Sequence, residues 1–427
     1  MTMAETSTIE PSSTTHWVLR LTAAVALAAV IFFFFVAQVG DSGWLVVLGV
    51  ALAIAIVLVN RLLPPITIRE SGTIHWVFRA CGAAILIAFV YHYYLDASAT
   101  VLGNLIEACI LAIAAVSLNL LLGFNGQISI GHSTFVGLGA FGAGYAVNNL
   151  DWNPYVSLLL ALVLCFLLGL ALGLPALRLK GPYLALVTLA VAFVWPTIAN
   201  IFLEKKVKST KLNGLRLKPP SWTQLKSNRL DTAVYLYIIA VVLLVLSYVV
   251  VRNLRKSRIG RSLVAVRDNE TAAAVMGVNL KRTKTITFGI SAAIAGAAGW
   301  LTAAYLATLT VETFTIRNAI VYLLALFLGG AATMSGPIVG AFVYYFLNKY
   351  LIEHAKNWHW LPGPFHKGGV APFLLGVLVI AFVFIAPFGI VGYIKAQARR
   401  FFVVAPRPLQ LTAAAPVLTD HPVDEQA

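Results

Sequence analysis

Charged residues are scarce in this sequence. Only 11% of its 427 residues are Asp, Glu, Lys or Arg, whereas 60% are hydrophobic. A water-soluble domain carries about 25% charged residues, and a soluble protein of this size could not cover its core with so few. The composition therefore excludes a soluble enzyme, a nucleic-acid-binding protein and a disordered chain. It indicates a polytopic membrane protein that has no nucleic acid partner.

Several motifs are also missing. The three cysteines, Cys81, Cys109 and Cys165, all lie in apolar stretches, which favours small buried side chains over a disulfide framework. No G-x-x-x-x-G-K-[ST] phosphate-binding loop is present, so we expect no ATP site and no cofactor on this chain. The first sixteen residues contain no Lys or Arg, which argues against a cleaved signal peptide.

Long apolar runs dominate what is there. A helix needs about 20 apolar residues to cross a bilayer, and nearly continuous candidates occupy 17–39, 43–60, 76–95, 101–122, 156–175, 182–203, 232–251, 285–307 and 370–394. Two glycine-rich apolar regions, 128–147 and 318–353, add to them, and the second is expected to hold two helices broken near Gly329 and Gly330. The sequence thus predicts an all-α polytopic transmembrane helical bundle of about 10–12 membrane helices. Broken or re-entrant segments are expected near 123–133 and 329–337.

The runs also suggest a division of the chain. We expect a cytoplasmic N-terminal tail at 1–16, extra transmembrane helices at 17–99, a main transmembrane domain at 100–394 and a C-terminal tail at 395–427. Within that tail, 403–427 is rich in proline, alanine and acids, and we expect it to be disordered.

The net charge of +15 is unevenly distributed over the loops. With the N-terminus inside, the cytoplasmic side carries 19 Lys and Arg and the opposite side 12, which moderately favours that orientation. Nine basic residues fall in 252–284, and eight fall in 204–231. A single span separates these two loops, so one of them must be a basic external loop.

The loop 252–284 contains a helix-compatible stretch, 262–276, which is rich in alanine and which Gly277 should end. Small side chains here let another surface approach the backbone closely. The stretch is equally compatible with a helix that docks into a partner and with an amphipathic helix that lies at the lipid headgroups.

A family resemblance is carried by four segments. The string ETAAAVMG, 270–277, resembles the cytoplasmic coupling motif of ABC importer permeases. The longer string GRSLVAVRDNETAAAVMGVNLKRTKTITFGISAAIAGAAGWLTA is similar to the branched-chain amino acid permease family. Three further segments resemble the same family in order and spacing: NLLLGFNGQISIGHSTFVGLGAFG at 119–142, LRLKGPYLALVTLA from 177, and LFLGGAATMSGPIVG at 326–340.

The resemblance implies a permease subunit of an ATP-driven importer that carries branched-chain or related small amino acids. ATP and Mg would be used by two separate cytoplasmic ATPase subunits. The other implied partners are a second homologous permease, or a second copy, and an extracytoplasmic solute-binding protein. The expected location is the bacterial inner membrane, with both termini cytoplasmic. The residues implied to contact the ATPase are Arg267, Asp268, Glu270, Ala272, Ala273 and Gly277.

With the coupling loop inside, loop 204–231 faces outside. Its basic residues could complement an acidic rim on the binding protein. The candidate docking residues are Lys205, Lys206, Lys208, Lys211, Asn213 and Gly214. A basic loop without a partner is the alternative. This loop also departs from the family, because only part of its glycine-rich string is kept, and the substrate is correspondingly open.

Two polar, glycine-rich breaks are candidates for the translocation pathway, because unwound backbone in a membrane survives only in a protein interior or beside a cavity. They could be corresponding positions of an internal repeat. The alternative for the glycines, and for the histidine, is simple helix packing. The candidate residues are Asn119, Asn125, Gln127, Ser129, His132, Ser133, Gly329, Gly330, Ser335, Gly336 and Pro337.

Glu107 is the acid that lies well inside an expected span, and an intramembrane acid is a functional candidate unless it is simply hydrated near the outer end. His354, His359 and His366 fit no common zinc spacing, so no metal site is expected. The alternatives for function are import of urea, short amides or another small solute by the same architecture, a stand-alone secondary transporter, and a membrane-embedded enzyme or scaffold.

Overall fold

The computed structural model describes residues 66–69, 99–174, 182–207, 211–215, 217, 228–355, 373, 376–377, 380, 389–393 and 402–405. The chain divides into two compact units, 83–395 and 1–82 with 396–427. The predicted spans 17–39, 43–60 and 76–95, and most of 370–394, lie outside the described residues.

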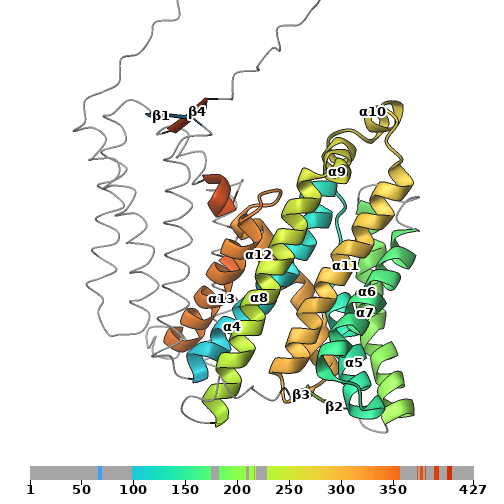
Figure 1. Cartoon of the computed structure of the whole chain (residues 1–427), viewed down its shortest axis with the longest axis vertical. Coiled ribbons are helices and arrows are strands. Elements are labelled where there is room, and N and C mark those ends of the chain that lie inside the picture. The colour runs from blue at the N-terminus through green and yellow to red at the C-terminus, as the bar shows by residue number, and fades with distance from the viewer. Residues whose placement is uncertain are drawn as a thin grey trace, which may run out of the picture. The chain divides into compact units, whose positions relative to one another are not determined.

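The larger unit is an all-α bundle, as the sequence predicts (Figure 1). Six of its helical segments are long and apolar enough to cross a membrane within the part of the chain that is described. Its labelled helices among the described residues are α4 (Ala99–Leu118), α5 (His132–Leu150), α6 (Pro154–Gly173), α7 (Pro182–Phe202), α8 (Asn228–Lys256), α9 (Arg258–Asp268), α10 (Glu270–Val275), α11 (Leu280–Tyr305), α12 (Ile316–Gly329) and α13 (Gly336–Ala355).

Short irregular elements interrupt these helices. The π-helix Asn119–Phe124 continues α4, and a second π-helix, Leu203–Val207, ends α7. Strand β2 (Leu212–Asn213) pairs antiparallel with β3 (Thr308–Leu309), and a 3₁₀ turn covers Val311–Phe314. Figure 1 shows this strand pair at the opposite end of the bundle from α10.

The bundle is sorted into inner and outer helices. In the apolar windows of the segment that begins with α4 and of α11, 83% of the residues are buried, against 28% in α6 and 33% in α7. The outer helices instead expose rows of large apolar side chains, such as Leu159 and Phe193, at 62% and 63% of their surface. Exposed apolar rows of this kind suit contact with lipid tails rather than with water.

Small residues allow α11 to approach its neighbours closely. A Cβ atom added to Gly299 would lie 2.0 Å from the carbonyl oxygen of Val136, and one added to Gly139 would lie 2.5 Å from the carbonyl oxygen of Gly296. Such contacts are typical of membrane helices, whose association rests on close packing rather than on the hydrophobic effect. Cys109 and Cys165 are buried and unpaired, as predicted.

The smaller unit contributes one described element, a parallel pair of strands. Strand β1 (Ile66–Arg69) pairs with β4 (Phe402–Ala405) in a register that joins Ile66 to Phe402. The prediction of disorder is therefore wrong for 403–405, because backbone pairing with a segment distant in the sequence compensates for the lack of a long apolar run. The rest of the C-terminal tail lies outside the described residues.

The close approach at Gly299 generates a stability prediction. Gly299→Ala should lower the thermal unfolding midpoint of the detergent-purified protein, because overpacking a tight contact costs about 1–3 kcal/mol. Gly376→Ala is the matched control, since a Cβ atom there meets nothing within 4 Å. Thermal unfolding followed by size-exclusion chromatography measures both variants. Equal midpoints would contradict the proposed helix contact.

Candidate functional site

The two predicted breaks exist and face each other. After the π-helix Asn119–Phe124 the chain is irregular until α5 begins at His132. The second break is the turn between the end of α12 at Gly329 and the start of α13 at Gly336, and Pro337 lies in the first turn of α13 as expected. A π-helix within an α-helix often marks a functional position.

Asn119 joins the two breaks directly. Its side-chain Nδ2 donates to the carbonyl oxygen of Thr333 at 2.8 Å, and its Oδ1 accepts from the backbone nitrogen of Ala332 at 2.9 Å. Asn119 is almost fully buried. Ala332 has a φ of 62°, an unusual conformation for a residue other than glycine, and the Asn119 amide satisfies its backbone nitrogen there.

Thr333 completes the second break, and sequence analysis missed it. Its hydroxyl donates to the carbonyl oxygen of Gly330 at 2.8 Å and accepts from the backbone nitrogen of Gly336 at 3.0 Å. It therefore caps α13 from within the turn. Gly329, Gly330, Gly336 and Pro337 are buried, and only Ser335 is exposed.

Close packing explains the glycines of this turn. A Cβ atom on Gly329 would lie 1.7 Å from the carbonyl oxygen of Gly336, so the ends of α12 and α13 touch through their backbones. This geometry favours the packing interpretation over a lining role for Gly329 and Gly336. Whether Ser335 faces a solute stays a prediction.

His132 lies in a closed hydrogen-bond network. The hydroxyl of Ser291 donates to the carbonyl oxygen of Ser117 at 2.6 Å, so its oxygen is free to accept from His132 Nε2 at 3.0 Å. The network then leaves Nδ1 as the acceptor facing Ser129 Oγ at 3.4 Å. Because both ring nitrogens have partners, the arrangement favours the predicted alternative of a packed histidine over a gate.

The neighbouring polar residues are less completely paired. Asn125 Nδ2 donates to Gln127 Oε1 at 2.6 Å, and both residues are buried. Among the described residues Asn125 Oδ1, Gln127 Nε2 and Ser133 Oγ have no hydrogen-bond partner. Buried polar atoms without partners are costly and uncommon, so the first break is a polar interior that is incompletely satisfied.

The segment 252–284 differs from the single helix predicted over 262–276. Between the end of α8 and the start of α11 it holds two helices, α9 and α10, separated by Asn269, whose extended backbone (φ −159°) breaks the first helix. The Asn269 side chain then caps α10 by accepting from Ala272 N at 3.0 Å. The strong capping preference of asparagine outweighs the helix propensity of the alanines that follow.

Gly277 ends α10, as predicted. Its φ is 83°. The Gly277 nitrogen donates to the Ala274 carbonyl oxygen, and the Val278 nitrogen donates to the Ala273 carbonyl oxygen, both at 3.0 Å. This is a Schellman arrangement. The Asn279 side chain then caps α11 by accepting from Arg282 N at 2.9 Å. Capping residues thus define the end of α10 and the start of α11.

The polar residues predicted to meet a partner here are bonded within the chain. Arg267 Nη1 donates to the carbonyl oxygen of Gly123 at 3.0 Å, and its Nη2 pairs with Asp268 Oδ1 at 2.9 Å. Glu270 Oε1 pairs with the buried Lys284 Nζ at 2.6 Å. Their described contacts therefore attach the element to the bundle.

Arg267 also explains the glycine at position 126. Gly126 has a φ of 73°, and a Cβ atom there would lie 2.9 Å from Arg267 Cγ. The guanidinium of Arg255, from the end of α8, lies 5.3 Å from the ring centroid of Phe124. Two arginines thus hold the first break against the end of the bundle that carries α10.

The exposed tip of α10 is apolar. Val275 and Met276 expose 82% and 83% of their surface, and Ala272 is exposed beside them, whereas Ala273 is buried. Ala273 therefore packs inward, contrary to its predicted place at a partner surface. The sequence pattern pointed to the alanines but missed the two larger apolar residues, which only the position of Gly277 could have suggested.

The candidate docking residues at the other end fall into two groups. Lys211 and Asn213 are exposed beside β2. Gly214 is buried, its nitrogen donates to the Ala307 carbonyl oxygen at 3.0 Å, and a Cβ atom there would lie 1.8 Å from the Leu306 carbonyl oxygen. Gly214 is thus a packing position rather than a surface contact. Lys208 and the side chains of Lys205 and Lys206 lie outside the described residues.

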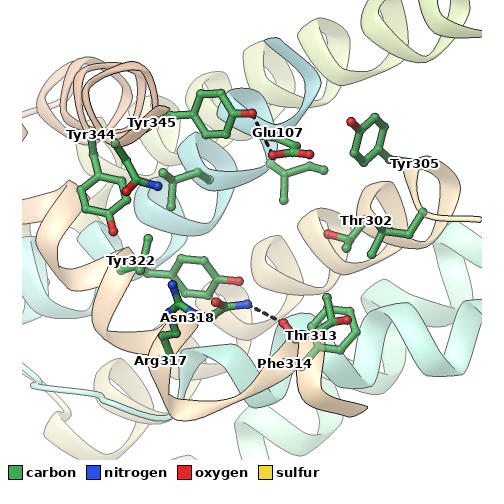
Figure 2. Close-up of a pocket in the computed structure, with 15 residues that line it drawn as sticks. Glu107, Thr302, Tyr305, Thr313, Phe314, Arg317, Asn318, Tyr322, Tyr344 and Tyr345 are labelled. Atoms are coloured by element: carbon green, nitrogen blue, oxygen red, sulfur yellow. Dashed lines mark hydrogen bonds between the residues drawn. The ribbon is translucent and has the colours of Figure 1, made fainter. Parts of the chain in front are cut away.

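A cavity of about 360 Å³ lies between α4, α11, α12 and α13 (Figure 2). Glu107, which the sequence singled out, lines it and accepts from the Tyr345 hydroxyl at 2.8 Å. Sequence analysis missed the rest of this wall, because it comes from four helices distant in the chain. The polar and aromatic lining includes Tyr305, Arg317, Asn318, Tyr322 and Tyr344.

Comparison with known proteins identifies a family that this chain resembles over most of the larger unit. Residues 100–386 match the family described as "Branched-chain amino acid transport system / permease component". The high-affinity branched-chain amino acid transport system permease protein LivM of Escherichia coli (strain K12) is 30% identical over 251 residues, which cover 54% of this chain and 58% of that protein. The match thus spans less than two thirds of that relative.

Two further relatives are more distant. The probable branched-chain amino acid transport permease protein LivM of Methanocaldococcus jannaschii is 26% identical, over 58% of this chain and 72% of that protein. The autoinducer 2 import system permease protein LsrC of Enterobacter sp. (strain 638) is 28% identical, over 60% of this chain and 71% of that protein. No solved structure matches the chain.

The family match covers more than half of the sequence and includes both breaks, α9, α10 and the helices that line the cavity. The chain is therefore a multi-pass membrane protein that belongs to the family of permease components of branched-chain amino acid transport systems.

Proposed function

We propose that this chain is the permease subunit of an ATP-driven importer that moves branched-chain or related small amino acids into the cell. Its family and the names of the two LivM relatives support this class of solute. The structural observation that carries the proposal is the α9–α10 element, a protruding pair of short helices with an exposed apolar tip that is bonded to the first break.

The tip of α10 suits a protein partner. Fully burying a Val or Met side chain gains about 1.5–3 kcal/mol, so the exposed Val275 and Met276 favour insertion into a groove. Two cytoplasmic ATPase subunits supply such grooves in the proposed complex and use the ATP and Mg, and a second permease or a second copy of this chain supplies the other half. Ala272 and the backbone near Gly277 allow close approach.

Hydrogen bonds connect that tip to both breaks. Arg267 in α9 holds the Gly123 carbonyl, and Asn119, one helical turn earlier, holds the turn at Ala332 and Thr333. A displacement of α9 by the ATPases would therefore move the π-helix and the α12–α13 turn together. This connection is our proposed route from ATP binding to alternating access of the pathway.

The proposed orientation follows the distribution of basic residues. The α10 end faces the cytoplasm together with both termini, and the inner membrane of a bacterium is the proposed location. The opposite end, with β2, Lys211 and Asn213, then faces a solute-binding protein that delivers the amino acid. Steering by the basic loop 204–231 would give this contact a strong dependence on ionic strength.

A different small solute on the same architecture is the second candidate. The relative LsrC is named for autoinducer 2 import. Its match covers a share of this chain similar to that covered by the LivM relatives. One relative of this chain is thus named for another solute, and urea or short amides belong to the same alternative.

Energy coupling separates the importer from a stand-alone secondary transporter. Leucine uptake by proteoliposomes that contain the full complex should require ATP and continue after a protonophore collapses the proton gradient. A catalytically inactive ATPase subunit is the matched control and should abolish uptake. Uptake that persists without ATP and stops with the protonophore would exclude the importer.

The tip of α10 generates a second prediction. Val275→Lys should reduce co-purification of the ATPase subunits about tenfold, because a charge replaces an apolar contact that is buried in the complex. Ile259→Lys is the control, since Ile259 is an apolar residue of α9 that is 41% exposed. Equal co-purification of the two variants would remove α10 as the docking element.

The contact between Arg267 and Gly123 generates a third prediction. Arg267→Met should leave the ATPase bound and hydrolysing ATP, yet lower the leucine transported per ATP about tenfold, because the connection to the first break is lost. Arg258→Met is the control, as Arg258 is exposed at the start of α9. Parallel assays of uptake and phosphate release measure the ratio, and a wild-type ratio in the Arg267 variant would refute this route.

A further inference from the structure

We propose that the cavity between α4, α11, α12 and α13 binds the zwitterionic head of an α-amino acid, with Glu107 facing the ammonium and Arg317 facing the carboxylate. This inference rests on the proposed function and adds a substrate site to it. The site is distinct from the two breaks, because none of the pathway residues expected from the sequence lines this cavity.

The position of Glu107 requires a polar environment. It lies in the middle of α4, where most neighbours are fully buried, yet its own side chain is exposed toward the cavity. An ionised carboxylate at membrane depth is costly unless it faces water or a cationic partner. In Figure 2 the Tyr345 hydroxyl binds one carboxylate oxygen and Tyr305 points toward the same group.

Arg317 supplies the opposite charge from a different wall. It lies in the first turn of α12, is exposed and lines the same cavity. Within the part of the chain that the structure describes, no ion pair joins Glu107 or Arg317 to a counter-charge. A guanidinium presents two parallel donors to a carboxylate, which is the geometry an amino acid head group offers.

Part of the remaining lining suits an aliphatic side chain. Ile110, Leu111, Leu306, Phe314 and Val321 contribute apolar surface to the cavity beside its tyrosines, threonines and asparagines. Its volume of about 360 Å³ is at the lower end of the range for small-molecule pockets. One acid, one base and an apolar wall in a small volume favour a compact zwitterion with an apolar tail over a neutral amide.

The cavity also has the right place along the bundle. Tyr305 ends α11 shortly before β3, and Thr313 and Phe314 belong to the 3₁₀ turn that follows. The cavity therefore opens nearer the strand pair than the α10 end. In the proposed orientation it lies between the binding protein and the two breaks, where an entering solute first meets the permease.

Ligand analogues test the assignment of each charge. The full chain in nanodiscs is titrated with radiolabelled leucine at equilibrium, and unlabelled leucine, leucinamide and 4-methylpentanoate compete. Leucinamide lacks the carboxylate, and 4-methylpentanoate lacks the ammonium. On the wild-type chain we expect each analogue to compete about tenfold or more weakly than leucine, because each loses one charge-assisted contact.

The variants should remove these penalties selectively. In the Glu107→Gln variant, the affinity for leucine should fall until it equals the affinity for 4-methylpentanoate. Leucinamide should still bind more weakly than leucine. With Arg317→Gln the pattern should reverse. Glu312→Gln, which removes an exposed acid from the 3₁₀ turn outside the cavity lining, is the matched control and should behave like the wild type. Size-exclusion profiles check that every variant is folded.

The assignment is overturned if the variants lower the binding affinity equally for all three ligands, or if neither variant changes the affinities. The absence of leucine binding to the folded wild-type chain also overturns it. Because this assay needs no ATP hydrolysis, it fails independently of the proposed function. ATP-driven leucine uptake with wild-type KM in the Glu107→Gln complex would keep the importer and reject this site.

Discussion

The buried amide of Asn119 satisfies backbone groups that the bilayer cannot. Both breaks interrupt helices in a region where unpaired backbone nitrogens and carbonyls cost several kcal/mol each. The amide is suited to the task because it donates and accepts from one side chain, to Thr333 O and from Ala332 N. The two breaks therefore stabilise each other, and the hydrogen bonds of Asn119 hold the helices on either side together.

The position of that coupling explains why α9 lies where it does. Gly123, one turn after Asn119, directs its carbonyl at Arg267, so the π-helix is bonded to an inner turn on one side and to the α9–α10 element on the other. Lys284 in α11 anchors the start of α10 through its salt bridge to Glu270. A salt bridge between exposed partners is worth little, but Lys284 is buried, so losing Glu270 would leave a charge without a partner. The element is thus firmly seated while its apolar tip stays free of the bundle.

Local sequence signals predicted what depends on local physics. Continuous apolar runs located the spans that became α4, α6, α7, α8 and α11, and glycine paired with serine located both breaks. Gly277 correctly marked a helix end, because only a residue tolerant of positive φ fits there. The same signals failed at Asn269, where a cap outweighed helix propensity, and in the C-terminal tail, where strand β4 depends on a distant segment.

Contacts between distant segments could not be predicted from the sequence. Asn119 and Thr333 are 214 positions apart, and Arg267 lies 144 positions from Gly123, so no pattern in either segment names its partner. The cavity shows the same limit. Glu107 stood out because an acid is anomalous in an apolar run, whereas Arg317 looked like an ordinary loop charge until α12 placed it across from α4. An isolated charge in a span is therefore best interpreted as half of a site, whose other half must be sought on a neighbouring helix rather than in the nearby sequence.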